Sequence, residues 1–280
     1  MKEIVFSKRI PDVMGKRAQK ELTGGKWHGI AYPHIFLDKK YNFIDGEYPD
    51  RCDIKGNYFG EDKKIKYHDG AAHLNSSQVV CISFFKKFFE KEKWEFLLLN
   101  LLKECGIPIN AENIDYAIFE YEPNPKERTN FDFYMILEDG THISFEIKYT
   151  ESEFGGITPD KKDPDKYKRK WKDIYADMME KCPYLSCSEQ EFYEKGRYQI
   201  NRNICYAREG DVVLFLTPRA NDAAGLVEGR EYIDSFTRVN PKIRNIYWED
   251  VIEKMMPFVE DEPELVEYFK RFKKKYIDIL

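Results

Sequence analysis

Three residues in two neighbouring strand-like segments have the types and spacing needed for metal-assisted hydrolysis. Segment 130–137 reads NFDFYMIL and segment 141–150 reads THISFEIKYT, with apolar residues at almost all odd positions. Successive side chains of a strand point to opposite faces, so Asp132, Glu146 and Lys148 lie on the face away from this apolar side. The pattern predicts two carboxylates and an amine on one face of a sheet.

The Glu-Asp-Gly connection between these segments determines how they pair. A two-residue Asp-Gly turn would set odd positions opposite even ones and mismatch the two apolar faces. A three-residue loop, with Gly140 in the left-handed conformation, avoids this mismatch. In that register Leu137 faces Thr141, and Asp132 lies directly opposite Glu146.

Two opposed carboxylates this close repel each other, so the pair requires a positive partner. A divalent cation held by Asp132 and Glu146 would satisfy both, and hard oxygen ligands favour Mg²⁺ or Mn²⁺ over zinc. Lys148 can add further positive charge. In an alternative interpretation, the three residues form an ordinary ion-pair network on an exposed strand face.

Hydrophobic periodicity predicts an α/β fold that contains these strands. Helices are expected from Ser76, as an N-terminal cap, and again over 94–107, ending at Gly106. Three strands (115–122, 130–137 and 141–150), helices over 166–182 and 189–207 with a stop at Gly210, and a strand at 211–218 complete the order. The last strand is continuously apolar, which is typical of a strand covered on both faces.

The rest of the chain suggests additions to this core. We expect an N-terminal extension over 1–72, a core over 73–220 and a C-terminal helical extension over 221–280. The last contains a loop from about residue 220, the segment 247–256 and a terminal helix, whose lysine cluster we interpret as a solvated face, with a binding surface as the alternative.

Composition narrows the class of protein. The 280 residues include six cysteines without a CxxC pair, so neither a zinc site nor a disulfide framework is expected. The chain has no apolar run of membrane-spanning length and no signal-peptide pattern, which favours the cytoplasm and no membrane partner. The net charge of -5 means that any contact with DNA must come from a local basic face.

At these motifs the chain resembles the PD-(D/E)XK nuclease superfamily, and in particular a bacterial group of restriction endonuclease-like proteins. Asn-Phe-Asp at 130–132 matches the first acidic motif without its usual proline, and Glu-Ile-Lys at 146–148 matches the E-x-K motif. The strings HLNSSQ, TNFD, EIKYTE and YQINRN carry the closer resemblance, which covers residues 73–218. It implies a restriction-endonuclease-like αβββαβ core with a mixed central sheet flanked by helices.

The resemblance also implies roles for single residues. Asp132 and Glu146 would bind Mg²⁺ or Mn²⁺ together with the carbonyl of Ile147, and Lys148 would orient or activate the attacking water. Glu120 would join them if residue 120 faces residue 132; otherwise it is a solvated strand residue.

Two further features resemble DNA-contacting parts of such enzymes. Gln199 and Asn203 share one helical face and would line the cleft, although both amides could instead cap loops or face solvent. The basic segment 161–173 could contact phosphates, with Trp171 stacking on a base, or form an ordinary solvated helix.

The implied function is a Mg²⁺-dependent endonuclease that hydrolyses DNA, of the restriction or defence type. A homodimer and a cognate methyltransferase are its expected partners. One alternative is a catalytically inactive DNA-binding or assembly module with the same fold. Another is a small-molecule enzyme or a structural protein of mixed α/β class.

Overall fold

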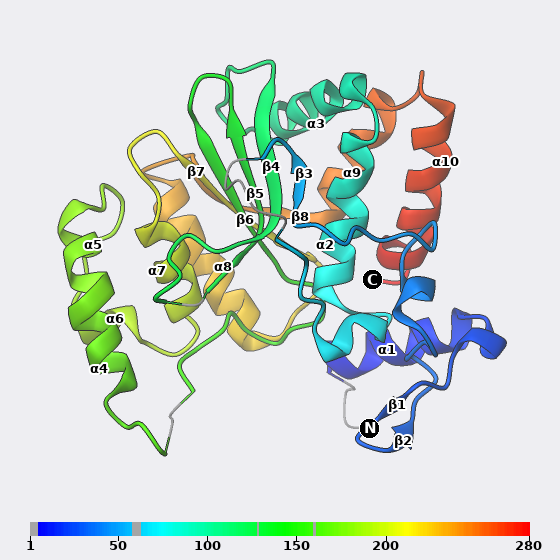
Figure 1. The fold of residues 1–280 in the computed structure, drawn as a ribbon, viewed down its shortest axis with the longest axis horizontal. Helices are drawn as coiled ribbons and strands as arrows, with labels where there is room; N and C mark the ends of the chain where they lie inside the picture. The colour runs from blue at the N-terminus through cyan, green and yellow to red at the C-terminus, as the bar shows by residue number, and fades with distance from the viewer. Residues whose placement is uncertain (1–4, 58–62, 128, 159–160) are drawn as a thin grey trace.

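A six-stranded mixed sheet lies at the centre of the molecule, with helices on both sides (Figure 1). The computed structural model describes residues 5–57, 63–127, 129–158 and 161–280. The sheet order is β3-β4-β5-β6-β7-β8, antiparallel from β3 to β6 and parallel from β6 to β8. Its strands are β3 (Asp53–Lys55), β4 (Ile114–Tyr121), β5 (Phe131–Leu137), β6 (His142–Ile147), β7 (Val212–Thr217) and β8 (Ile243–Tyr247).

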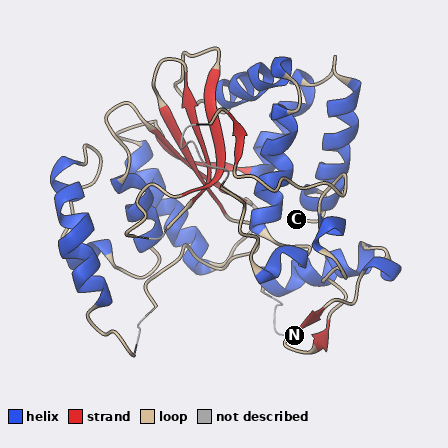
Figure 2. Cartoon of the chain, viewed as in Figure 1, coloured by secondary structure: helices blue, strands red, loops and turns tan. Residues whose placement is uncertain are grey.

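The helices are short and are divided between the two faces of the sheet (Figure 2). They are α1 (Phe6–Arg17), α2 (Ser77–Lys86), α3 (Glu92–Glu104), α4 (Lys166–Lys170), α5 (Ala176–Lys181), α6 (Glu189–Phe192), α7 (Tyr198–Cys205), α8 (Ala224–Thr237), α9 (Trp248–Phe258) and α10 (Pro263–Phe272). Two π-helical turns, η5 (Trp171–Tyr175) and η6 (Lys273–Ile277), continue α4 and α10. A small separate sheet pairs β1 (Lys26–Trp27) with β2 (Ile30–Ala31).

Two apolar clusters sandwich the sheet, as the alternation in the strands predicts. On one side, Phe133 and Phe145 pack with helices α2, α3, α9 and α10, and Phe85 stacks on Phe133 at a ring distance of 4.1 Å. On the other, Phe215 of β7 packs with residues of α7 and α8. Alternate residues of β7 enter the two clusters, which confirms the prediction of a strand covered on both faces.

The expected hairpin between β5 and β6 is confirmed. Its ladder pairs Phe133 with Phe145 and Met135 with Ile143, and the N–H of Leu137 donates to the Thr141 carbonyl at 2.9 Å. Gly140 has φ +78° in the three-residue loop, a conformation that costs glycine little because it has no Cβ. The expected α/β class, with a mixed central sheet flanked by helices, is confirmed as well.

Other predictions about the elements need correction. The helix expected over 189–207 is interrupted at Gly196, whose φ is +77°, and α7 ends at Cys205 instead of at Gly210. The loop expected from about residue 220 contains the 14-residue helix α8 and leads to strand β8. The sequence analysis also predicts neither edge strand of the sheet, β3 or β8.

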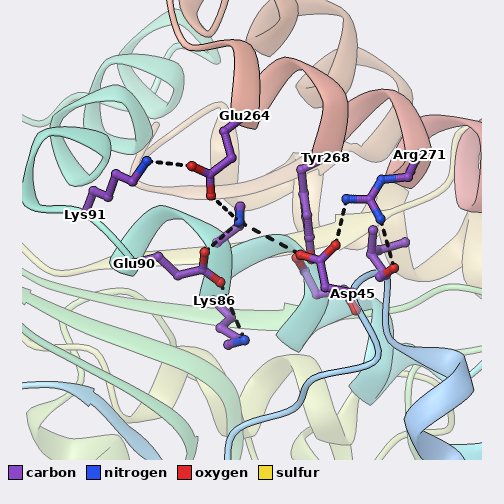
Figure 3. A network of polar contacts seen from close by, with 10 residues as sticks. Asp45, Lys86, Glu90, Lys91, Glu264, Tyr268 and Arg271 are labelled. Atoms are coloured by element: carbon purple, nitrogen blue, oxygen red, sulfur yellow. Dashed lines mark hydrogen bonds and ion pairs between the residues drawn. The ribbon is translucent and has the colours of Figure 1, made fainter.

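A polar network ties the N-terminal segment to α10 (Figure 3). The buried Lys87 amine contacts Glu90 at 2.6 Å and Glu264 at 3.0 Å, and Arg271 contacts Asp45 at 2.6 Å. Tyr268 donates to the Ser83 carbonyl at 2.6 Å. These contacts join three segments that are far apart in sequence: the loop that contains Asp45, the end of α2 and helix α10. All three lie on the side of the sheet away from α7.

Candidate active site

The sheet opens at one end of the β5–β6 pair, and the candidate residues lie at this opening. The last backbone pair of the ladder is Phe133 with Phe145, and the same register places Asp132 opposite Glu146. The Oδ2 atom of Asp132 accepts a hydrogen bond from the Ile147 N–H at 2.6 Å. A side chain thus satisfies a backbone donor at the point where the two strands separate.

Glu146 is held from two elements. Its Oε1 atom accepts hydrogen bonds from Lys148 at 2.8 Å and from Gln199 at 2.5 Å, while its Oε2 atom accepts one from Asn203 at 2.8 Å. The side chain of Glu146 is only 3% exposed, so these donors compensate for the loss of water. Helix α7 therefore fixes the orientation of this carboxylate.

Arg202 is a member of the site that the sequence analysis does not name. Its Nη2 atom lies 3.6 Å from Oε2 of Glu146, and its Nε donates to Asn203 at 3.1 Å. It follows Gln199 by three residues, and this spacing places both on adjoining parts of one helical face. That spacing is the signal that could have identified it.

Glu120 lies opposite Asp132, as one of the two interpretations of this residue requires. Phe119 pairs with Phe133 and Tyr121 pairs with Phe131, and the position between them brings residues 120 and 132 together. Gln78 and Asn130 donate to the Glu120 carboxylate at 2.8 and 3.0 Å. Glu120 has φ +52°, an uncommon conformation for a non-glycine residue that these contacts help to maintain.

The charges at the opening are unbalanced around Asp132. Burial raises its pKa well above the usual value, as do the negative charges of Glu146 and Glu120, against the opposing effects of Lys148 and the Ile147 N–H. Burial acts to lower the pKa of Lys148, but Glu146, Glu151 and Asp132 outweigh it and raise that pKa. The opening can therefore accept further positive charge at Asp132.

The donor set fits Mg²⁺ better than a softer metal. Among the described residues, no cluster of three or more His, Cys, Asp or Glu side chains could hold a metal ion. Mg²⁺ needs fewer side chains, because it commonly keeps several waters and binds one or two carboxylates. Within the described parts of the chain, only the Oδ2 atom of Asp132 accepts a hydrogen bond, so Oδ1 is available to such an ion.

The loop between β4 and β5 carries the buried Glu127. Tyr206 donates to its Oε2 atom at 2.5 Å, Tyr175 donates to Oε1, and the Lys170 amine donates to its backbone carbonyl at 3.0 Å. Tyr206 directly follows α7, Tyr175 lies in η5 and Lys170 ends α4, so Glu127 links the loop after β4 to these helices. Lys170, from the basic segment 161–173, thus takes part in a structural contact.

Trp171, considered above as a stacking platform for a base, is partly buried and packs against the apolar cluster on the α7 side of the sheet. Its ring lies 5.4 Å from that of Phe192 and 6.3 Å from that of Tyr193. It therefore helps to attach η5 to α6. Asn203 and Gln199, in contrast, both donate to Glu146, and Oε1 of Gln199 also accepts the Gly155 N–H at 2.8 Å, so this amide holds the loop after β6 as well.

Comparison with known proteins places the chain in a family. No curated protein and no solved structure matches it significantly. Within the described residues, no helix has both the length and the apolar character needed to cross a membrane. The family model REase-ARP, described as "Restriction Endonuclease associating with ARP", matches residues 26–277. Because this match spans most of the chain, the protein belongs to that restriction-endonuclease-like family.

Proposed function

We propose that the protein is an endonuclease of the PD-(D/E)XK type that hydrolyses DNA with Mg²⁺ or Mn²⁺. The observation that carries this proposal is the convergence of Asp132, Glu146 and Lys148 at the opening between β5 and β6. The family match supports a nuclease or defence role independently of this geometry.

Asp132 and Glu146 would hold the ion, with the Ile147 carbonyl as a third protein ligand. When bound, the ion would neutralise phosphate charge and lower the pKa of a water molecule. Asp132 can contribute Oδ1, while Glu146 has one lone-pair site, on Oε2, beyond those used by its three hydrogen bonds. Glu120, opposite Asp132, would add a negative charge that strengthens attraction to a cation.

The other residues of the site would position the reactants. The Lys148 amine lies 2.8 Å from Glu146 and would orient the attacking water beside the scissile phosphate. Gln199 and Asn203 would keep the Glu146 carboxylate in one orientation, so little reorganisation is needed when substrate arrives. The raised pKa of Lys148 favours its charged form, which is suited to an electrostatic role.

Nicking of supercoiled plasmid DNA tests this proposal. Wild-type protein, Glu146→Gln and Lys148→Ala are incubated with plasmid and MgCl₂, with EDTA as the metal-free control. We expect wild-type nicking that EDTA abolishes, and a loss of at least 100-fold in both variants, as is typical when one charge-stabilising group is removed. Asp115→Asn, an exposed change on β4, should retain activity. Equal nicking by all four proteins would indicate a contaminant and overturn the proposal.

A catalytically inactive DNA-binding or assembly module is the second candidate. It is favoured by the near-complete burial of Glu146 and by a family description that names an associating partner. DNA binding without nicking by freshly purified wild-type protein, in Mg²⁺ and in Mn²⁺, would support this candidate over the enzyme.

Two partner proposals accompany the endonuclease. Two active sites can cleave both strands of a duplex in one binding event, so we propose a homodimer on DNA, which light scattering of the protein–duplex complex can test. A cognate methyltransferase would protect host DNA. Equal cleavage of methylated and unmethylated plasmids would argue against this partnership.

A further inference from the structure

A cavity lies between the N-terminal helix and the end of the chain, away from the residues that surround Glu146. It has a volume of about 560 Å³, which is within the range of about 300–1,000 Å³ typical of small-molecule sites. Its walls come from α1, the segment 36–44 and the α10–η6 helix, which meet near the C-terminus in Figure 1.

The interior of the cavity is apolar. Met14, Phe36, Phe43, Leu74 and Ile279 line it, and each of them is itself buried. Such a surface favours an apolar ligand by roughly 25 cal/mol for each Å² removed from water. An entirely polar molecule would gain little here.

Cations surround this apolar interior. Arg17, Arg271, Lys274 and Lys275 line the cavity, and no Asp or Glu is among its described lining residues. This concentration of positive charge stands out in a chain whose net charge is -5. A ligand with an anionic group would therefore be favoured over a cationic one.

The four cations differ in how strongly they are already engaged. Arg271 is paired with Asp45, and the Lys275 amine donates to Oδ1 of Asn42 at 2.9 Å. Within the described residues, Lys274 forms no ion pair, and Arg17 makes only a long contact of 3.5 Å with a backbone carbonyl. Lys274 and Arg17 are thus the groups with the most capacity to bind an incoming anion.

Lys275 adds a half-buried donor at the wall of the cavity. Asn42, which holds it, is itself fully buried and donates to the Ala71 carbonyl at 2.9 Å. Burial lowers the pKa of Lys275 to about 7, and an anion nearby would favour its charged form. The sequence analysis favours a solvated face over a binding surface for the lysine cluster; Lys274 is exposed, and both it and Lys275 line the apolar hollow.

We propose that this cavity is a binding site for an amphipathic anion, a molecule that joins one carboxylate, phosphate or sulfonate group to an apolar body. The apolar body fills the hollow and the anionic group contacts Lys274 and Arg17. This site is separate from the candidate active site and does not depend on the proposed nuclease activity.

Isothermal titration of the full chain with octyl phosphate tests the proposal, with octanol and inorganic phosphate as matched probes for each half of the molecule. We expect one octyl phosphate per chain and at least tenfold weaker binding of both halves. Equal binding of octanol would show that the cations contribute nothing. Equal binding of inorganic phosphate would show that the hollow contributes nothing. Either outcome would overturn the proposal.

Variants locate the bound molecule. Lys274→Gln combined with Arg17→Gln should weaken octyl phosphate binding at least tenfold, whereas Lys273→Gln, a neighbouring lysine outside the cavity lining, should leave it within twofold. Ala18→Leu should also weaken binding by filling space while keeping every charge. Unchanged binding in both the double variant and Ala18→Leu, with normal thermal unfolding, would place the molecule elsewhere and refute this site.

Discussion

Replacing Asp132 by Asn should stabilise the metal-free protein. Opposed residues on a sheet face have Cβ atoms about 5 Å apart, and unit charges at that distance repel by roughly 3 kcal/mol at an effective dielectric constant of about 20. Glu146 and Glu120 both oppose Asp132. Attraction to Lys148 offsets about 2 kcal/mol, and the charged hydrogen bond to Ile147 offsets about 1.5–3 kcal/mol. We expect the variant to gain about 2 kcal/mol in free energy of unfolding at neutral pH.

The pH dependence follows from the raised pKa of Asp132, caused by burial and by Glu146 and Glu120. The folded protein binds this proton more tightly than the unfolded chain does. The associated stability is therefore fully present below the unfolded pKa of Asp and is lost as pH rises through the higher folded pKa. Asp132→Asn should lack this loss, so its advantage over wild type should grow with pH.

Urea unfolding in EDTA between pH 4 and pH 8 measures both effects. Asp115→Asn makes the same chemical change at an exposed position of β4 and should alter stability by less than 0.5 kcal/mol. Adding MgCl₂ at about 100 times its Kd should stabilise the wild type by about 2.7 kcal/mol and the Asp132 variant far less. If Asp132→Asn were destabilised in EDTA and retained the wild-type pH slope, the electrostatic reasoning would be refuted.

Three further changes test the packing around the site by urea unfolding. Glu127→Gln should cost about 1–3 kcal/mol in free energy of unfolding, because the amide nitrogen cannot accept a hydrogen bond from the Tyr206 hydroxyl. An unchanged urea midpoint would mean that this contact contributes little. Gly229→Ala should cost about 1–3 kcal/mol, since its Cβ would lie 2.3 Å from Cδ2 of Phe154, and a more stable variant would contradict this close packing. Phe85→Ala should cost about 3–5 kcal/mol as a fully buried ring is lost, and a cost below 1 kcal/mol would disprove its central place in the core.

The central hairpin could be predicted because one physical constraint decides it. Each of its strands buries one face, so a register error of one residue would move every apolar side chain to the wrong side. Gly140 supplied the turn, and the opposition of Asp132 and Glu146 followed from the register. The ladder confirms this register as far as Phe133 and Phe145. Beyond that pair the strands separate, which periodicity could not reveal.

The unpredicted elements lack strong local signals. Strand β3 has three residues, too few to establish alternation, and it exists because β4 pairs with it. Helix α8 has no side-chain N-terminal cap and contains Gly225 and Gly229, both poor helix formers. Its stability comes from packing, in which Leu226 and Ile233 are fully buried and Gly229 lets Phe154 approach. Tertiary contacts of this kind are not visible in a single sequence.

The two opposed carboxylates of the candidate site differ in a way that bears on metal binding. Glu146 is satisfied by Lys148 and two amides of α7, so its geometry is already fixed without a metal. The ionised form of Asp132 is disfavoured by burial and by its acidic neighbours, which raise its pKa. Under the proposed function, Glu146 would fix where Mg²⁺ binds. Asp132 would account for most of the stability that the protein gains on binding Mg²⁺, because the ion neutralises its unfavourable charge. Removing the α7 amides should therefore impair activity more than metal affinity, whereas removing the Asp132 charge should impair both.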